Sequence, residues 1–77
     1  MKEKLEYVSR NIKSYRAKYD YSQENMAKFL SVSRITYNDY ETNPQKLKVE
    51  TLQQIADILK CEIADFFKEI KVTDSNK

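Results

Sequence analysis

Residues 22–41 contain two short segments whose apolar residues recur at helical spacing, with only Ser31-Val32-Ser33 between them. The first segment places three apolar residues on one helical face: Met26, Ala27 and Leu30. The second carries two aromatic residues three positions apart: Tyr37 and Tyr40. A connection of three residues is too brief for anything except a tight turn between two helices. This stretch therefore predicts a helix-turn-helix.

Each of the two segments begins after a serine that can cap a helix. The hydroxyls of Ser22 and Ser33 can accept hydrogen bonds from the free amide groups of a first helical turn. The second segment directs four polar side chains away from its tyrosines: Arg34, Thr36, Asn38 and Asp39. It is therefore predicted to bury one stripe and to leave a hydrogen-bonding face for a partner.

Further apolar periodicity predicts three more helices and an all-α, five-helix fold. A stripe at steps of three and four predicts a long helix over residues 3–19: Leu5, Val8, Ile12, Tyr15 and Tyr19. The central pair is expected at about 23–30 and 34–41, and the last two helices at about 50–59 and 63–69. Because the chain has no glycine and only one proline, a β-rich fold with many tight turns is disfavoured. Residues 1–70 are expected to form a single domain, and the polar residues 71–77 a flexible C-terminal tail.

The residue inventory disfavours an enzyme, a metal site and a cofactor site. The chain has no histidine, which removes the usual general base, and no glycine loop to bind phosphate. Its single cysteine, Cys61, cannot form an internal disulfide, and without histidine a metal site is not expected. No apolar run approaches the ~18 residues of a membrane span, and the N-terminus does not resemble a signal peptide. A cytoplasmic protein is therefore expected.

Charge is distributed unevenly along the chain. Residues 1–48 hold ten Lys and Arg against six Asp and Glu, whereas residues 49–77 hold four against six. A basic N-terminal part favours a polyanionic partner, but solvated surfaces often carry such imbalances. The charge distribution is thus weak support for a nucleic-acid partner.

The spacing within residues 22–41 also meets the geometric needs of DNA recognition. In a helix-turn-helix the first helix supports the second at a fixed angle, so that the second can enter a major groove about 12 Å wide. Ala27 supplies a small residue where the two helices approach, and Ser31 stands where the turn needs left-handed backbone. The pattern alone leaves open any other helical hairpin.

Residues spread over every predicted helix match one family of such domains: Ile12, Arg16, Ser22-Gln23-Glu24, Met26-Ala27, Val32-Ser33-Arg34, Tyr40-Glu41, Leu52, Ile55-Ala56, Leu59, Ile63 and Phe66-Phe67. Through them, positions 9–67 resemble the phage-repressor/Cro-type helix-turn-helix domain, also called the xenobiotic-response-element family. The resemblance implies a five-helix, lambda-repressor-like domain that binds a DNA operator, usually as a homodimer, and commonly represses transcription. Three departures stand where the family usually has glycine: Ser31 in the turn, Thr42-Asn43 after the third helix and Lys60 after the fourth.

The resemblance also implies roles for individual residues. The expected base contacts lie on the second helix of the pair: Arg34, Ile35, Thr36, Asn38 and Asp39. The resemblance implies a phosphate contact for Gln23, and four more residues are expected to contact phosphate because they lie on or beside that helix: Ser33, Tyr37, Asn43 and Lys46. Tyr37 is expected chiefly in the core, and the loop around Lys46 can alternatively serve only solubility.

Two further sets of residues are expected to hold the structure together. The resemblance implies an ion pair between Arg16 and Glu41 that joins the first helix to the end of the third. Phe66, Phe67 and Ile70 are more apolar than a short terminal helix needs for its own burial, and the resemblance implies that this region contributes to a dimer contact.

These features predict sequence-specific binding of double-stranded DNA by a transcriptional regulator. The alternative is a protein-interaction module of the same fold, antitoxin-like or coactivator-like, with little or no specific DNA binding. The two differ in a simple property, since a DNA-binding regulator must bind duplex DNA in a strongly salt-dependent way.

Overall fold

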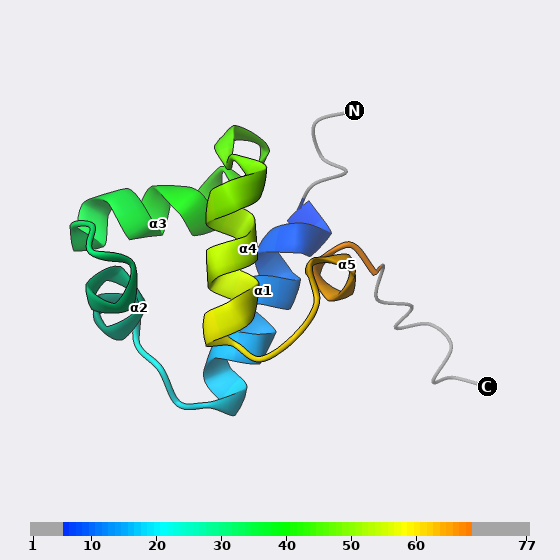
Figure 1. The fold of residues 1–77 in the computed structure, drawn as a ribbon, viewed down its shortest axis with the longest axis horizontal. Coiled ribbons are helices and arrows are strands. Elements are labelled where there is room, and N and C mark those ends of the chain that lie inside the picture. The colour runs from blue at the N-terminus through cyan, green and yellow to red at the C-terminus, as the bar shows by residue number, and fades with distance from the viewer. Residues whose placement is uncertain (1–5, 69–77) are drawn as a thin grey trace.

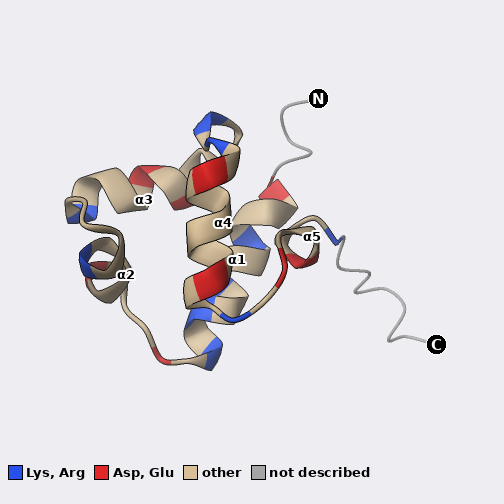
Figure 2. Ribbon diagram, in the orientation of Figure 1, with Lys and Arg blue, Asp and Glu red and all other residues tan. Residues whose placement is uncertain are grey.

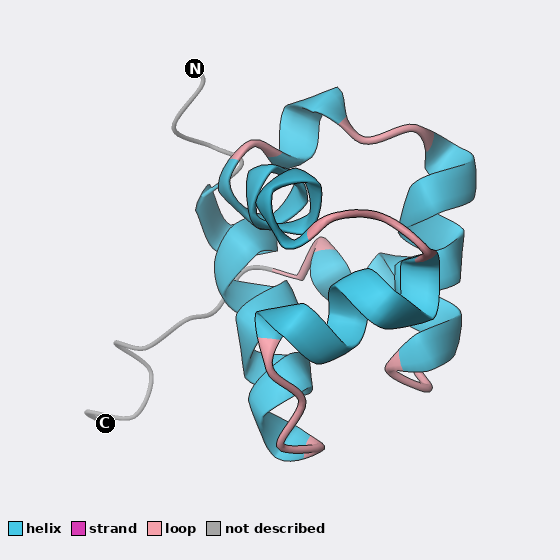
Figure 3. Ribbon diagram, turned by 90° about the vertical axis from the view of Figure 1, so that its left-hand side faces the viewer, coloured by secondary structure: helices cyan, strands magenta, loops and turns pink. Residues whose placement is uncertain are grey.

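The computed structural model describes residues 6–68, which form five α-helices and one short 3-10 helix (Figure 1). In chain order these are α1 (Glu6–Lys18), α2 (Gln23–Leu30), α3 (Arg34–Thr42), η2 (Pro44–Lys46), α4 (Val49–Ile58) and α5 (Ile63–Phe66). The described residues contain no strand (Figure 3). The prediction of an all-α, five-helix fold is therefore confirmed.

Both helices of the central pair begin at the serines that the sequence indicates. Ser22 Oγ accepts from the backbone N–H of Asn25 at 3.0 Å, and Asn25 Oδ1 accepts from the backbone N–H of Ser22 at 2.9 Å. At α3, Ser33 Oγ accepts from the backbone N–H of Thr36 at 3.0 Å. Each cap satisfies an amide that has no partner inside its own helix. The two predicted caps are confirmed.

The turn between α2 and α3 is left-handed at Ser31. This residue has φ 60° and ψ 42°, and its N–H donates to the carbonyl oxygen of Lys28 at 3.1 Å. Lys60, after α4, adopts a similar conformation with φ 56°. A left-handed backbone costs a residue with a Cβ atom roughly 1–2 kcal/mol of stability, a cost that glycine does not have. The sequence expectation of left-handed backbone in the turn is confirmed.

One core joins all five α-helices. Each helix contributes a side chain with 0% exposure: Ile12, Met26, Tyr37, Ile55 and Phe66. Burial of such a side chain stabilises the fold by about 1.5–3 kcal/mol. The position of each helix is therefore tied to that of the other four.

The two helices of the central pair lie together on one side of the molecule. Figure 1 shows α2 nearly along its axis and α3 lying across the view, with α1, α4 and α5 on the other side. Helix α3 packs against α2 and α1, and α2 also packs against α4. The outer side of α3 remains in solvent, where Ile35 is 81% exposed.

The predicted helix ends agree with the structure to within one residue where both are described, except at α5. Helix was predicted over residues 63–69, whereas α5 ends at Phe66. Asn11, itself buried in α1, donates from Nδ2 to the carbonyl oxygens of Phe66 at 2.7 Å and of Lys68 at 2.8 Å. These bonds satisfy carbonyl groups left free where the helix stops. Residue 69 and the predicted start of the first helix at residue 3 lie outside the described residues.

Candidate nucleic-acid interface

A buried ion pair fixes the C-terminal half of α3 against α1. Arg16 Nε donates to Glu41 Oε2 at 2.6 Å, and Arg16 Nη2 donates to Glu41 Oε1 at 3.2 Å. The side chain of Glu41 is 1% exposed and that of Arg16 18%. Arg16 Nη1 also donates to the carbonyl oxygen of Tyr21 at 3.0 Å, in the segment before α2. The expected pair is thus present, and it connects α1, α3 and the approach to α2.

Glu41 receives further hydrogen bonds from three helices. Tyr37 Oη donates to Oε2 at 2.5 Å, and Gln23 Nε2 donates to Oε1 at 3.2 Å. The hydroxyl of Ser9 donates to the backbone carbonyl oxygen of Glu41. A buried carboxylate is tolerated when it is paired and its oxygens accept hydrogen bonds. Among the described residues, no buried side-chain nitrogen or oxygen lacks a partner.

The environment fixes the protonation of both partners of Glu41. Burial alone lowers the pKa of Arg16, but the hydrogen bond and the charge of Glu41 outweigh burial and raise that pKa above its ordinary value. Burial, followed by the hydrogen bond and charge of Glu41, raises the pKa of Tyr37 well above that of an ordinary phenol. At neutral pH Arg16 is therefore a cation and Tyr37 a neutral hydrogen-bond donor.

Tyr37 lies in the interior and is not available to bind phosphate. Its side chain is 0% exposed, and its hydroxyl is bonded to Glu41 one helical turn further along α3. The prediction that Tyr37 contacts phosphate is wrong, because the buried carboxylate draws its hydroxyl inward. Its predicted place in the core is confirmed.

The outer face of α3 carries four of the residues that were expected to contact bases. Arg34, Ile35 and Asn38 are exposed, and Thr36 is half-buried. The hydroxyl of Thr36 accepts from Ser33 Oγ at 3.0 Å, next to the helix cap. The exposed strip therefore combines a guanidinium group, an aliphatic side chain and a primary amide.

Gln23, the first residue of α2, links this outer face to the buried ion pair. Its Nε2 donates to Asn38 Oδ1 at 3.0 Å as well as to Glu41 Oε1 at 3.2 Å. An amide oxygen has a second lone pair, and the Asn38 amide nitrogen carries two N–H donors. Asn38 is thus held in one orientation and can still both donate and accept outward.

Asp39 differs from the other expected base contacts because both of its oxygens meet groups of its own domain. Asn43 Nδ2 donates to Asp39 Oδ1 at 2.7 Å, and Lys46 Nζ lies 3.8 Å from Asp39 Oδ2. Figure 2 shows basic residues at the start of α3 and again in the segment after it, with acidic residues between them. Asn43 and Lys46, which were both expected to bind phosphate, therefore both contact the carboxylate of Asp39.

The residues expected to form a dimer contact do not share one surface. Phe66 is 0% exposed and packs edge-on against Tyr15, with ring centroids 5.9 Å apart, so its predicted role in a dimer is wrong. Phe66 is the last residue of α5, and its side chain lies in the core. Phe67 is 44% exposed. Ile70 lies outside the described residues.

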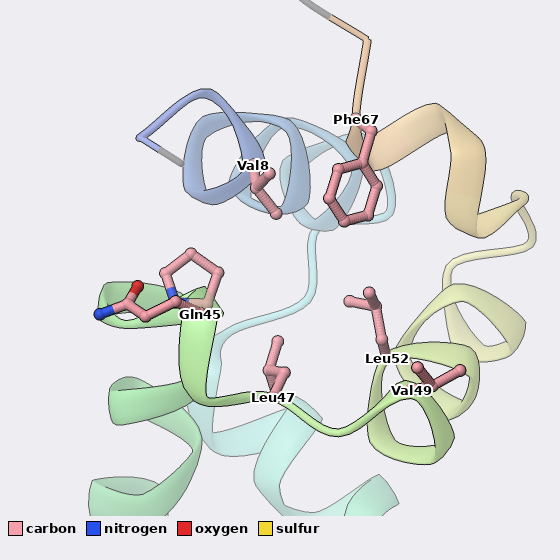
Figure 4. A pocket seen from close by; sticks show the side chains of 7 residues that line it. Val8, Gln45, Leu47, Val49, Leu52 and Phe67 are labelled. Carbon is pink, nitrogen blue, oxygen red and sulfur yellow. The ribbon is translucent and has the colours of Figure 1, made fainter. Parts of the chain in front are cut away.

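Phe67 borders an apolar groove with a volume of about 300 Å³. The groove is lined by residues of α1, the segment between α3 and α4, α4 and the end of α5: Val8, Pro44, Gln45, Leu47, Val49, Leu52 and Phe67. Figure 4 shows Phe67 beside Val8, with Leu47 and Leu52 across the groove. Val49 is 74% exposed. This end of the molecule thus presents apolar side chains to solvent.

Three residues that hold this arrangement were not predicted: Ser9, Asn11 and Tyr21. Asn11 has a recognisable signal, because it is a polar residue beside Ile12 in the apolar stripe of the first helix. Tyr21 accepts through its backbone carbonyl oxygen, which any residue could supply. The sequence holds no comparable signal for Ser9.

Residues 6–68 hold neither a cluster of metal ligands nor a membrane-spanning helix. No group of three or more His, Cys, Asp or Glu side chains in that range could hold a metal ion. None of its helices is both long and apolar enough to cross a bilayer.

Comparison with known proteins agrees with the geometry of α2 and α3. The family model described as helix-turn-helix matches residues 12–66, which is most of the chain. Neither the curated proteins nor the solved structures give a match. The matched range includes both helices of the pair and the Arg16–Glu41 ion pair. The chain therefore belongs to the Cro/repressor-type helix-turn-helix family, with the lambda-repressor-like fold of a DNA-binding domain.

Proposed function

We propose that this protein binds a double-stranded DNA operator sequence-specifically and represses transcription, by placing α3 in the major groove. The observation that carries the proposal is the division of α3 into two faces. Tyr37 and Glu41 anchor the helix inside the domain, while Arg34 and Asn38 are exposed on its other side. An anchored helix with an exposed polar face suits hydrogen bonding to base edges.

The exposed side chains match three kinds of base contact. Arg34 can donate two hydrogen bonds to guanine, and Asn38 can donate to and accept from adenine. Ile35 or the methyl group of Thr36 can contact the methyl group of thymine. Gln23 contributes indirectly, since it fixes the Asn38 amide in one orientation.

Polar groups on both sides of α3 are suited to the DNA backbone. Gln23 stands at the N-terminus of α2, where free amide groups favour an anion. Ser33 precedes α3, and Asn43 and Lys46 follow it. In this proposal these residues bind phosphates and set the register of α3, without selecting a sequence.

We also propose that the protein acts as a homodimer, with Phe67 and Val49 in the contact. Both residues are apolar and solvent-exposed, at 44% and 74%, beside the groove of Figure 4. Two copies would bind half-sites about one helical turn apart. The test is sedimentation at high micromolar concentration, with and without DNA, of the natural protein and of Val49→Lys. A dimer that dissociates in Val49→Lys supports the contact, and a monomer under both conditions contradicts it.

The test of the main proposal is selection of binding sites from a pool of random duplex oligonucleotides, followed by a salt series. A regulator should enrich one sequence, bind it far more tightly than random duplex, and lose affinity steeply with salt. Absence of salt-sensitive binding would instead favour the protein-interaction module of the same fold. Repression is tested separately, by placing the enriched sequence across the promoter of a reporter and measuring its transcript.

A further inference from the structure

Asp39 is the solvent-accessible acid of α3, because its side chain is 45% exposed and that of Glu41, the other acid of the helix, is buried. Asp39 lies among residues proposed to contact DNA, where its negative charge opposes DNA binding because a carboxylate repels phosphate. Its own contacts are with Asn43 Nδ2, at 2.7 Å, and with Lys46 Nζ, at 3.8 Å. Those two residues flank α3 on the side where the proposed function expects phosphate contacts.

A carboxylate and a phosphate accept hydrogen bonds from the same donors. The ammonium of Lys46 and the amide of Asn43 can each bond to either anion. In the free protein the oxygens of Asp39 thus contact the donors that would bind phosphate oxygens in the proposed complex. When DNA binds, Lys46 must leave the carboxylate of Asp39 to contact a phosphate. The free energy of the lost ion pair reduces the net contribution of Lys46 to DNA affinity.

We propose that Asp39 lowers affinity for DNA of unrelated sequence, by holding Lys46 and Asn43 in the free protein and by repelling phosphate in the complex. This inference depends on the proposed function of α3. At a matching site, the released carboxylate can accept from the amino group of cytosine. Random DNA does not offer that donor at a fixed position. Asp39 therefore enlarges the difference between operator and random sequence.

The exposure of the group makes this role testable without unfolding the protein. The side chains of Asp39 and Lys46 are 45% and 65% exposed. Ion pairs as exposed as this contribute little to stability. Asparagine at position 39 has the same shape and retains an oxygen that can accept from Asn43, so α3 should keep its C-terminal turn.

The experiment compares Asp39→Asn with Asp57→Asn, in the full chain, on a random-sequence duplex across a salt series. Asp57 is an exposed acid on α4 that accepts from Gln53 Nε2 at 2.8 Å, so its substitution removes the same charge elsewhere. Asp39→Asn should bind the random duplex roughly fivefold more tightly than the natural protein. It should also steepen the slope of log K against log salt by about 1, since the surface that faces the phosphates gains one unit of net positive charge. Asp57→Asn should change affinity less than about twofold.

A double-mutant cycle tests whether Asp39 acts through Lys46. If it does, Asp39→Asn should have a much smaller effect in a Lys46→Ala background than in the natural protein. The ratio of operator affinity to random-duplex affinity should also fall in Asp39→Asn. Equal effects of Asp39→Asn and Asp57→Asn would overturn the inference, and so would weaker binding of random duplex by Asp39→Asn.

Failure of this inference can be told apart from failure of the proposed function. If the natural protein shows no salt-sensitive binding of duplex DNA, the proposed function itself is contradicted. If the natural protein binds an operator but the two Asp→Asn variants behave alike, only the role of Asp39 is contradicted. Thermal unfolding of each variant controls for a change in the fold.

Discussion

The two faces of α3 differ in where their partners lie. On the inner face Glu41 meets Arg16, Tyr37 and Gln23, all within the same chain. On the outer face Arg34 and Ile35 extend into solvent. One short helix thus has a side whose hydrogen bonds are made within the chain and a side whose polar groups are exposed to solvent.

This difference predicts that the two faces respond to substitution in separate ways. Removing a partner on the inner face leaves a buried polar group unsatisfied, which costs stability. Removing a side chain on the outer face leaves the domain intact and changes only what it binds. Gln23 and Asn38 form the link between the faces, so the separation is expected to be weakest there.

The largest effect is expected from Arg16→Ala. This change leaves the carboxylate of Glu41, whose side chain is 1% exposed, without its cation. Loss of one partner from a buried pair costs about 3–5 kcal/mol. Urea denaturation should therefore show a large loss of unfolding free energy.

Arg10→Ala is the matched control, because Arg10 is an exposed arginine on the same helix. Its effect on stability should stay within about 0.5 kcal/mol. If Arg16→Ala keeps its unfolding free energy but no longer binds DNA, the inner-face role of Arg16 is refuted and a phosphate contact is supported in its place.

Arg34→Ala should give the opposite result on the outer face. A side chain that pairs with guanine contributes about 1–3 kcal/mol, so affinity for the selected operator should fall roughly 5- to 150-fold. Specificity at one base pair should relax, while the unfolding free energy changes by less than about 0.5 kcal/mol. Titration of operator and of single-base variants measures both quantities. Equal losses on operator and random duplex would show that Arg34 binds phosphate instead.

Much of the scaffold that holds α3 could be predicted from the sequence, because its determinants are local or periodic. The caps at Ser22 and Ser33 and the left-handed turn at Ser31 follow from residue types at fixed offsets. The prediction of the ion pair between Arg16 and Glu41 rests on the family resemblance, because two charges 25 positions apart carry no periodic signal.

The errors share a physical cause, which is that aromatic residues suit both a core and a surface. Phe66 and Phe67 are identical in type and adjacent, yet one is fully buried and the other 44% exposed. The end of α5 decides between them, and that end depends on Asn11, 55 positions away in the chain from Phe66. Tyr37 was misassigned to phosphate for a similar reason, because the acceptor of its hydroxyl is buried.

Alkaline pH offers a quantitative probe of the inner face through Tyr37→Phe. Burial, then Glu41, raises the pKa of Tyr37 in the folded protein, whereas in the unfolded chain it is about 10. The resulting stabilisation is complete below pH ~10 and is lost above it by about 1.4 kcal/mol per pH unit, as the unfolded phenol ionises. At neutral pH Tyr37→Phe should cost about 1–2 kcal/mol, since Glu41 loses a donor. The stability difference between the two proteins should therefore narrow between pH 10 and 11, and a constant difference would contradict the burial of this hydroxyl.

Ser31→Gly should have the smallest effect. It tests whether the turn between α2 and α3 affects stability alone or also DNA binding. Ser31 is exposed and has φ 60°, where its Cβ atom costs roughly 1–2 kcal/mol. Glycine removes that cost but adds about 0.5–1 kcal/mol of chain entropy to the unfolded state, so the free energy of unfolding should rise by about 0.5–1 kcal/mol.

Ser14→Gly, at an exposed position inside α1, is the control and should lower stability by a similar amount. Operator affinity should be unchanged in Ser31→Gly, because the anchors of α3 stay in place. A variant that is more stable but binds its operator differently would show that the turn, as well as the buried carboxylate, sets the angle at which α3 is presented.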